Sequence, residues 1–354
     1  MVTRQNFRIL GTGRFLPPWK VTAEEVDERI EAPHGWTRQH TGVETRYECR
    51  APQSILTMGS EAIRLAMEQA RISWSDVDLL IDCSTSRYRP IPCNAAHYLN
   101  LAGTSARGIP CFDIQSTCLG FLVALNAVNG LFAAGGYRNI VLVASECAMK
   151  GVNWKQPESA GLIGDGAAAA VLASTPPFGP LLMVHETYAE HLDLCKVNGG
   201  AHYMTAMEYS EDRMSDYLFD MNGPAVFRVA LGRLPRMVRS LVAEWQSLPE
   251  NQSRSVSDLH IIPHQASPRA LDVVRGLLNS DEHHFHSQVR DVGNMAAASL
   301  PFMLDWCLRT HRIPTTGPFM LLGTSAGYAQ AAMILSQGPG GFEQAPVSEE
   351  SQSC

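Results

Sequence analysis

The chain has 354 residues, of which 45% are hydrophobic and 18% charged, and its formal net charge is −7 at pH 7. This is the balance of a folded globular protein with enough length for two domains or one large one, and an acidic net charge gives no support to nucleic-acid binding. The chain contains no run of eighteen apolar residues, so we expect no membrane span.

The nine cysteines form an odd set without a Cys-x-x-Cys pair. This spacing favours free thiols over a disulfide framework or a metal site. The N-terminal residues run directly into a predicted strand, without the apolar core of a secretory signal. We therefore expect a cytoplasmic protein with reduced cysteines and no bound metal, and we interpret the histidine cluster at 283–286 as a solvated loop.

The first half of the chain predicts alternating strands and helices. A strand beginning at Phe7 ends in a loop where Gly11 and Gly13 lack the third glycine and the helix of a dinucleotide fingerprint. Further predicted elements are a capped helix from Thr22, a helix over 54–71, buried strands over 77–83 and 139–145, and a strand over 167–172. The Pro-rich segment 175–180 predicts a linker.

The second half follows this predicted linker. Residues 181–222 have no readable period, and we interpret them as a lid or a subunit contact. The later elements are a helix over 227–242, a strand over 258–263, a helix over 295–304, and two strands around a glycine turn at 323–327. The Gly/Pro/Ser/Glu-rich tail, 338–354, has a composition typical of disorder.

The order of elements repeats between the two halves. The strand at 78–83 corresponds to that at 259–263, the Cys118 helix start to the Asn294 helix start, and the turn at 164–166 to that at 323–327. The sequence therefore predicts two duplicated α/β halves, 1–176 and 177–337. If they pack with pseudo-symmetry, Cys118, His264 and Asn294 face a common centre.

Cys118 lies where a polar turn gives way to an apolar helix. Ser116 and Thr117 are placed to cap that helix, and unpaired backbone N–H groups at its start would point at the sulfur. This environment predicts a lowered thiol pKa and a nucleophilic thiolate. The alternative is a cysteine that only packs, since free cysteines are often buried.

A thiolate, a strand-exit histidine and an asparagine at a second helix start predict acyl transfer from a thioester. The amide of Cys118 and an amide of the turn 323–327 would hold the oxyanion. His264 and Asn294 would donate to a second carbonyl oxygen as negative charge builds on it. Taken singly, His264 can also be a satisfied loop histidine and Asn294 an N-cap, and we interpret the turn at 164–166 as structural.

These residues resemble motifs of the thiolase superfamily, and most closely those of ketoacyl-acyl-carrier-protein synthase III. The motifs are Thr117-Cys-Leu-Gly-Phe121, Pro263-His-Gln-Ala266, Gly293-Asn-x-Ala-Ala-Ala-Ser299 and Gly164-Asp-Gly-Ala-Ala168. The resemblance extends from about Phe7 to Leu335. It implies a five-layered αβαβα fold, a homodimer, and ping-pong acyl transfer by Cys118, His264 and Asn294.

The resemblance also implies that the amide of Ser325 is the second oxyanion donor. Thioesters of coenzyme A or of an acyl carrier protein would be the substrates, with no tightly bound cofactor. Leu119 stands where many synthases have serine, and in this it resembles relatives that join two acyl chains head to head. Those relatives place a glutamate base near the position of Ile91.

Other family positions concern binding of the donor. Trp36 matches an aromatic residue that grips coenzyme A, but His40 and Pro157 replace two arginines of that site. Arg228 and Arg269 match basic positions that the family uses toward an acidic acyl carrier protein; the alternative is a solvated helix face.

The sequence therefore predicts an acyltransferase of the ketoacyl synthase III type, in specialised lipid or polyketide metabolism. Cys118 would be acylated first, and a Claisen-type condensation with a second acyl thioester would follow. Two alternatives stay open. One is transfer of the acyl group to an oxygen or nitrogen nucleophile, and the other is a non-catalytic partner subunit of a heterodimeric condensing enzyme.

Overall fold

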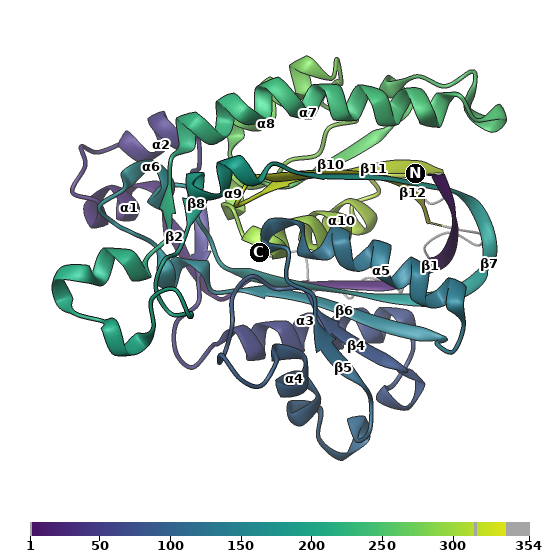
Figure 1. Cartoon of the computed structure of the whole chain (residues 1–354), viewed down its shortest axis with the longest axis horizontal. Coiled ribbons are helices and arrows are strands. Elements are labelled where there is room, and N and C mark those ends of the chain that lie inside the picture. The colour runs from purple at the N-terminus through teal and green to yellow at the C-terminus, as the bar shows by residue number, and fades with distance from the viewer. Residues whose placement is uncertain (1, 315–316, 338–354) are drawn as a thin grey trace.

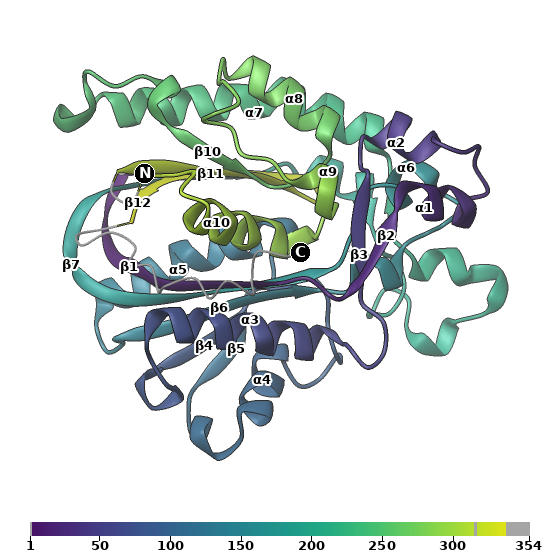
Figure 2. The same cartoon turned by 180° about the vertical axis from the view of Figure 1, so that it is seen from behind.

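The computed structural model describes residues 2–314 and 317–337 and arranges them in five layers (Figure 1). Two sheet layers enclose a central pair of helices, and further helices cover both outer faces (Figure 2). The predicted five-layered αβαβα fold is confirmed. The tail 338–354 lies outside the described residues.

Hydrogen bonds join the two sheet layers into one sheet of 8 strands, because the long strand β7 belongs to both. It pairs with β6 over residues 166–173 and with β12 over residues 182–187. The strand order is β10-β11-β12-β7-β6-β4-β5, with β1 also on β7. The strands are β1 (Val2–Phe15), β4 (Leu79–Asp82), β5 (Cys111–Asp113), β6 (Asn139–Glu146), β7 (Gly166–Thr187), β10 (His260–Pro263), β11 (Pro318–Ser325) and β12 (Ala329–Ser336).

The same strand pairing occurs twice. Parallel β4 and β6 precede an antiparallel partner, β7, just as parallel β10 and β11 precede antiparallel β12. Beside β4 lies parallel β5, and beside β10 the segment at Phe285 forms a parallel bridge to Ile261. The interpretation of 283–286 as a solvated loop is therefore wrong for His286, which is buried and stacks on His260.

The predicted linker at 175–180 is also wrong, because these residues are part of β7. The pairing of β1 with β7 is irregular here: Phe7 faces Ser174 and Gln5 faces Phe178. Pro176 and Pro177 fall in this irregularity, where a missing N–H removes no ladder hydrogen bond. The boundary at 176/177 thus falls inside a continuous strand.

Helices fill the other three layers (Figure 1). The central pair is α5 (Gly120–Ala134) and α10 (Ser299–Arg309); one outer layer holds α3 (Ile55–Ala70) and α4 (Asn94–Ala102), and the other α7 (Gly223–Gln246) and α8 (Pro268–Leu277). At one side lie α1 (Ala23–Arg29), α2 (Trp36–Thr41), α6 (Pro157–Ala160), α9 (Val289–Val292) and the two-stranded sheets β2 (Trp19–Thr22) with β3 (Thr45–Glu48) and β8 (Cys195–Lys196) with β9 (Asp220–Met221). The helices predicted from Thr22 and over 54–71 and 227–242 are confirmed.

One stretch of the described chain, Thr117–Ala134, is long and apolar enough by composition to cross a membrane, with a mean hydropathy of 1.7. Half of this stretch is buried within the molecule. Leu122, Leu125 and Val128 are fully buried, in a helix that lies between the two sheet layers. Its apolar character is that of a core helix enclosed on both sides.

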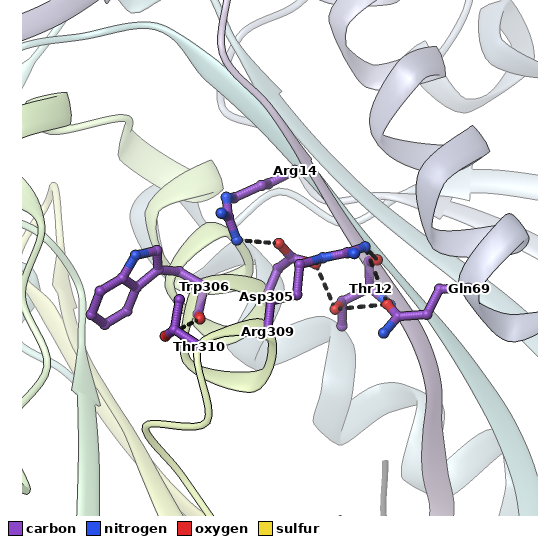
Figure 3. Close-up of polar contacts among 7 residues, drawn as sticks. All are labelled: Thr12, Arg14, Gln69, Asp305, Trp306, Arg309 and Thr310. Atoms are coloured by element: carbon purple, nitrogen blue, oxygen red, sulfur yellow. Dashed lines mark hydrogen bonds and ion pairs between the residues drawn. The ribbon is translucent and has the colours of Figure 1, made fainter. Parts of the chain in front are cut away.

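A buried polar cluster connects α10 to the N-terminal strand (Figure 3). The Asp305 carboxylate, which is fully buried, accepts from Arg14 at 2.6 Å and from Arg309 at 2.8 Å. It also accepts from the Thr12 hydroxyl at 2.7 Å, and the Thr12 N–H donates to Gln69 at 2.9 Å. The cluster therefore joins β1, α3 and α10, from distant parts of the chain.

Candidate active site

Cys118 lies in a 3-10 turn, Thr117–Leu119, directly before α5. The predicted side-chain cap is absent: α5 begins only at Gly120, and the Thr117 hydroxyl has no partner among the described residues. Thr117 has φ of 44°, so the chain enters the turn in a left-handed conformation. A Cβ on Gly120 would lie 2.2 Å from the Cys83 carbonyl oxygen, so the turn sits directly on the exit of β4.

The prediction of a lowered thiol pKa is wrong. Burial, followed by the charge of the Glu146 carboxylate and the Cys195 thiol, raises the pKa of Cys118 to about 12. The backbone N–H groups of Cys118 and Ala326 act in the opposite direction but do not outweigh burial. The thiol is therefore protonated at neutral pH in the free protein.

The amides around this sulfur are those of Cys118 itself and of Ala326, which follows β11. Ala326 lies in the turn 323–327 whose amides the sequence predicted to face the site, and it is the residue after Ser325, whose amide the resemblance implied. Because neighbouring amides of an extended strand point to opposite sides, a shift of one residue decides which N–H faces the turn. The Cys118 and Ala326 amides are therefore both directed at the Cys118 sulfur.

His264 directly follows β10, and its backbone N–H donates to the Leu322 carbonyl at 2.6 Å. The side chain is 5% exposed, and its Nδ1 has no partner among the described residues. Burial lowers the pKa of His264 to about 4, so the imidazole is neutral at physiological pH.

Gly323 on β11 places His264 next to the cysteine turn. A Cβ at Gly323 would lie 2.9 Å from the Leu119 side chain and 3.2 Å from the His264 Cβ. Only a residue without a side chain lets these two neighbours approach so closely. The turn that carries Cys118 and the loop that carries His264 therefore meet across β11.

Asn294 lies beside the His264 loop. Its Oδ1 accepts from the Ala296 N–H at 2.9 Å, and its Nδ2 donates to the Ala266 carbonyl at 3.3 Å. These contacts fix the orientation of the amide and use only one of the two Nδ2 hydrogens. The side chain thus caps a turn, as the simpler interpretation proposed, and still has one N–H for a ligand.

The turn at 164–166 is structural, as interpreted from the sequence. The fully buried Asp165 carboxylate accepts from the backbone N–H groups of Cys49 and Met149, each at 2.8 Å. Gly164 donates to the Asn294 carbonyl at 3.0 Å. The turn therefore fixes the segment that positions Asn294.

Glu146 is a residue near the site that the sequence reasoning missed. It ends β6 and is fully buried, and its carboxylate accepts from the Thr85 N–H at 2.6 Å, the Ser86 N–H at 2.9 Å and the Ser86 hydroxyl at 2.6 Å. Burial raises the pKa of this carboxyl group, while these hydrogen bonds act against the shift. A charged residue at the end of the apolar run 139–145 was the available signal.

The comparisons with known proteins agree with this geometry. The family model for 3-oxoacyl-[acyl-carrier-protein (ACP)] synthase III matches residues 112–185, and the model for its C-terminal part matches residues 250–337. The beta-ketoacyl-[acyl-carrier-protein] synthase III of Vesicomyosocius okutanii is 29% identical over 329 residues, which cover 93% of this chain and 98% of the relative. That of Neisseria gonorrhoeae is 27% identical over 331 residues, covering 94% and 99%.

Among solved structures, the priming β-ketosynthase of the R1128 polyketide biosynthetic pathway superposes with a TM-score of 0.83 at 26% identity, covering 97% of this chain and 98% of that one. Over nearly its whole length the chain is therefore similar to the ketoacyl synthases III. The matched segments include the turns and loops that carry Cys118, His264 and Asn294.

The three residues compared above with the family's coenzyme A site, Trp36, His40 and Pro157, lie on two neighbouring helices, α2 and α6. Trp36 begins α2 and stacks on His40, with ring centroids 4.3 Å apart. A Cβ on Gly161, which ends the Pro157 helix α6, would lie 2.6 Å from the Thr41 side chain of α2. The Arg269 guanidinium of α8 donates to the Gln39 carbonyl of α2.

Arg228 is exposed on α7 and lines a cavity of about 400 Å³. The cavity is also lined by His191, Arg233 and Arg236. Arg233 covers the Tyr188 ring at 3.7 Å and pairs with Glu190 at 3.2 Å. This face of α7 is therefore strongly basic in a chain whose net charge is −7.

No metal-binding arrangement is present in the described part of the chain, 2–314 and 317–337, where no group of three or more His, Cys, Asp or Glu side chains could hold an ion.

Proposed function

We propose that the chain is an acyltransferase that carries an acyl group on Cys118 and joins it to the carbon of a second acyl thioester. The observation that carries the proposal is the meeting, across Gly323, of the Cys118 turn with the loop of a neutral His264, whose Nδ1 has no partner among the described residues. The family relationship supports it, because the curated relatives are beta-ketoacyl-[acyl-carrier-protein] synthases.

In the first step the Cys118 sulfur attacks the thioester carbonyl. The oxyanion of the tetrahedral intermediate would receive the N–H groups of Cys118 and Ala326, which already converge on this place. Because the resting thiol is protonated, its proton must leave as the bond forms, and it ends on the departing thiolate of the donor. The products are the acyl-enzyme and a free donor thiol.

In the second step the α-carbon of the acceptor thioester loses either a carboxylate as CO2 or a proton, which ends on the Cys118 thiolate that is released. The carbonyl oxygen of the acceptor becomes an enolate oxygen. A neutral imidazole N–H from His264 and the free Nδ2 hydrogen of Asn294 would hold it. The enolate carbon attacks the acyl group, a carbon–carbon bond forms, and Cys118 leaves as the thiolate. Two uncharged donors suit this task, because their hydrogen bonds to the acceptor oxygen strengthen as negative charge develops on it. They bind the neutral ground state only weakly, so the stabilisation is specific to the transition state.

The donor is proposed to be an acyl group on an acyl carrier protein or on coenzyme A. Arg228 and Arg269 are exposed and offer positive charge to an acidic carrier, and Trp36 offers a ring for an adenine. Leu119, in place of a serine, is the residue that favours specialised over housekeeping metabolism in this proposal. A homodimer and a cytoplasmic location remain part of the proposal.

Mass spectrometry tests the first step. The purified chain is incubated with a panel of acyl-coenzyme A and acyl-carrier-protein donors, and the adduct is mapped by peptide digestion. The proposal requires an acyl adduct on Cys118 with at least one donor. An adduct confined to another residue, or none with any donor, contradicts it.

The mass of the released product tests the second step. Addition of a second thioester to the acylated protein should yield a β-keto product with a new carbon–carbon bond. An ester or amide product would instead establish transfer to an oxygen or nitrogen nucleophile. A chain that becomes active only when mixed with a homologue would establish a partner subunit.

A further inference from the structure

Two cysteines outside the proposed site, Cys93 and Cys111, lie at the junction of α4 and β5. Cys93 is the residue before α4, and Cys111 begins the edge strand β5. The Asp113 carboxylate accepts from the first two N–H groups of α4, those of Asn94 at 2.8 Å and Ala95 at 3.0 Å. Because residues two apart share one face of a strand, Cys111 lies on the face of β5 that α4 covers.

The two thiols are near enough to hydrogen-bond. Burial, together with the charge of Cys93 and this hydrogen bond, raises the pKa of Cys111 to about 11. Both cysteines are free and partly exposed. A second thiol pair, Cys49 and Cys147, is also hydrogen-bonded, but it is only 3% and 8% exposed.

We propose that Cys93 and Cys111 form a redox-responsive pair, which a low-molecular-weight disulfide such as glutathione disulfide converts into an intramolecular disulfide. Contact between the two thiols and access from solvent distinguish this pair from the buried one. The inference does not rest on acyl transfer, because it uses only the contact between the start of α4 and β5.

The chemistry is thiol–disulfide exchange. The Cys93 thiolate attacks one sulfur of the small disulfide, forms a mixed disulfide and releases one small thiol. The Cys111 thiolate then attacks the Cys93 sulfur, closes the protein disulfide and releases the second small thiol. Two protein thiols are oxidised, one small disulfide is reduced, and both protons end on the released thiols. Cys93 attacks first, because the Cys111 thiol is held in its protonated form.

The disulfide would tie down the base of the loop between β4 and α4. This loop is now held by the ion pair of Arg87 with Asp113 at 2.9 Å and by Asn94, which accepts from the Tyr88 N–H at 3.0 Å. Ile91, near its end, is 84% exposed. A covalent link beside Asn94 would restrict opening of the loop, and trypsin cleavage after Arg87 reports that opening.

The test treats the full reduced chain with glutathione disulfide, blocks the remaining thiols by alkylation, and maps the products by mass spectrometry. The expected product has lost two hydrogens and contains a peptide cross-linked through Cys93 and Cys111. Dithiothreitol should reverse the change, and trypsin should cleave the oxidised chain after Arg87 several-fold more slowly than the reduced chain.

Two variants keep the test independent of folding. Cys111→Ser should stop the reaction at glutathione on Cys93, since the resolving thiol is gone, whereas Cys147→Ser should leave the Cys93–Cys111 cross-link unchanged. The proposal is overturned if the parent chain keeps glutathione on Cys93 without a cross-link. It is equally overturned if both thiols stay free, or if the cross-link joins another pair in their place.

Discussion

The strand exits of the two halves share a backbone arrangement and differ in their side chains. Cys83 follows β4 as His264 follows β10, and each donates its N–H to the neighbouring parallel strand, to Val143 at 2.8 Å and to Leu322 at 2.6 Å. The Cys83 thiol is fully buried and donates to the Val143 carbonyl at 3.1 Å. The His264 Nδ1 has no partner in the described part of the chain. The polar group after β4 is therefore already hydrogen-bonded, whereas the one after β10 is available to a ligand.

The turns before the central helices α5 and α10 also share a backbone conformation and differ in their side chains. Thr117 and Ala296 both have left-handed backbones, with φ of 44° and 42°, and a three-residue 3-10 turn leads from each into α5 or α10. When the two turns are matched in this way, Cys118 corresponds to Ala297, and Asn294 lies three residues earlier. The repeated scaffold thus places the proposed nucleophile in one half and the proposed hydrogen-bond donors in the other.

The largest expected effect comes from removing one of two thiols, Cys118 or Cys83. Cys118→Ala should abolish the acyl adduct, because it removes the sulfur that the Cys118 and Ala326 amides face. Cys83→Ala, the matched loss of a buried sulfur, should keep the adduct on Cys118. Peptide mapping after incubation with donor compares them, and an adduct that persists in Cys118→Ala would break the assignment.

The next largest effect concerns the connection between the halves. Asp305→Ala removes the acceptor that joins α10 to β1 and leaves Arg14 and Arg309 without it (Figure 3). Because the side chains of Arg14 and Arg309 are 29% and 33% exposed and can turn to water, we expect a loss of about 1–3 kcal/mol, below the cost of an unpaired buried charge. Urea unfolding followed by circular dichroism should show this loss. Arg64→Ala, which breaks exposed pairs on α3, should change stability by less than about 1 kcal/mol.

A smaller effect concerns the electrostatics of the nucleophilic turn. Because the Glu146 charge contributes to the raised pKa of Cys118, Glu146→Gln should lower that pKa and accelerate alkylation by iodoacetamide at pH 8. Each unit of pKa corresponds to about a tenfold change in the thiolate fraction. In the parent chain the Cys118 alkylation rate should still be rising at pH 10, since the thiol pKa lies above that value.

Asp165→Asn is the control for Glu146→Gln. Burial also raises the pKa of the Asp165 carboxyl group, to about 7, but Asp165 is not among the groups that raise the pKa of Cys118. It should leave the alkylation rate of Cys118 unchanged. Equal acceleration by both variants would point to general loosening of the core.

The smallest effect is expected at the two exposed arginines proposed to contact the carrier protein. Arg228→Ala combined with Arg269→Ala should raise the KM for a carrier-protein donor by about fivefold at low salt, since exposed charge contacts contribute at most about 1 kcal/mol each. The difference should shrink as salt increases, and kcat should be unchanged. A KM that is insensitive to both charge removal and salt would place the carrier contact elsewhere.

Much of this architecture could be predicted because local pattern and tertiary environment agree. The helices over 54–71 and 227–242 have clear apolar periodicity, and the order of turns and strands repeats. The linker at 175–180 failed because a sheet irregularity tolerates prolines that composition assigns to loops. Buried His286 was missed because a strand-like bridge to β10 is a long-range contact.

The order of motifs led to a candidate site of Cys118, His264 and Asn294, but it did not lead to the protonation state of the thiol. The Cys118 pKa is raised because burial outweighs two backbone amides. The Glu146 carboxylate was missed, and the resemblance implied the Ser325 amide where the Ala326 amide faces the sulfur, since each depends on which way a group points at a strand end. Local sequence does not record that direction.

The central claim is that Cys118 carries the acyl group and that the side chains of His264 and Asn294 act only afterwards. Single-turnover kinetics with His264→Ala and Asn294→Ala test it directly, by following acylation of Cys118 and its discharge to a second thioester separately. The account predicts an unchanged yield of acyl-enzyme and a discharge slowed by about a hundredfold or more in each variant. Loss of acylation itself, with folding intact, or a discharge as fast as in the parent chain, would contradict it.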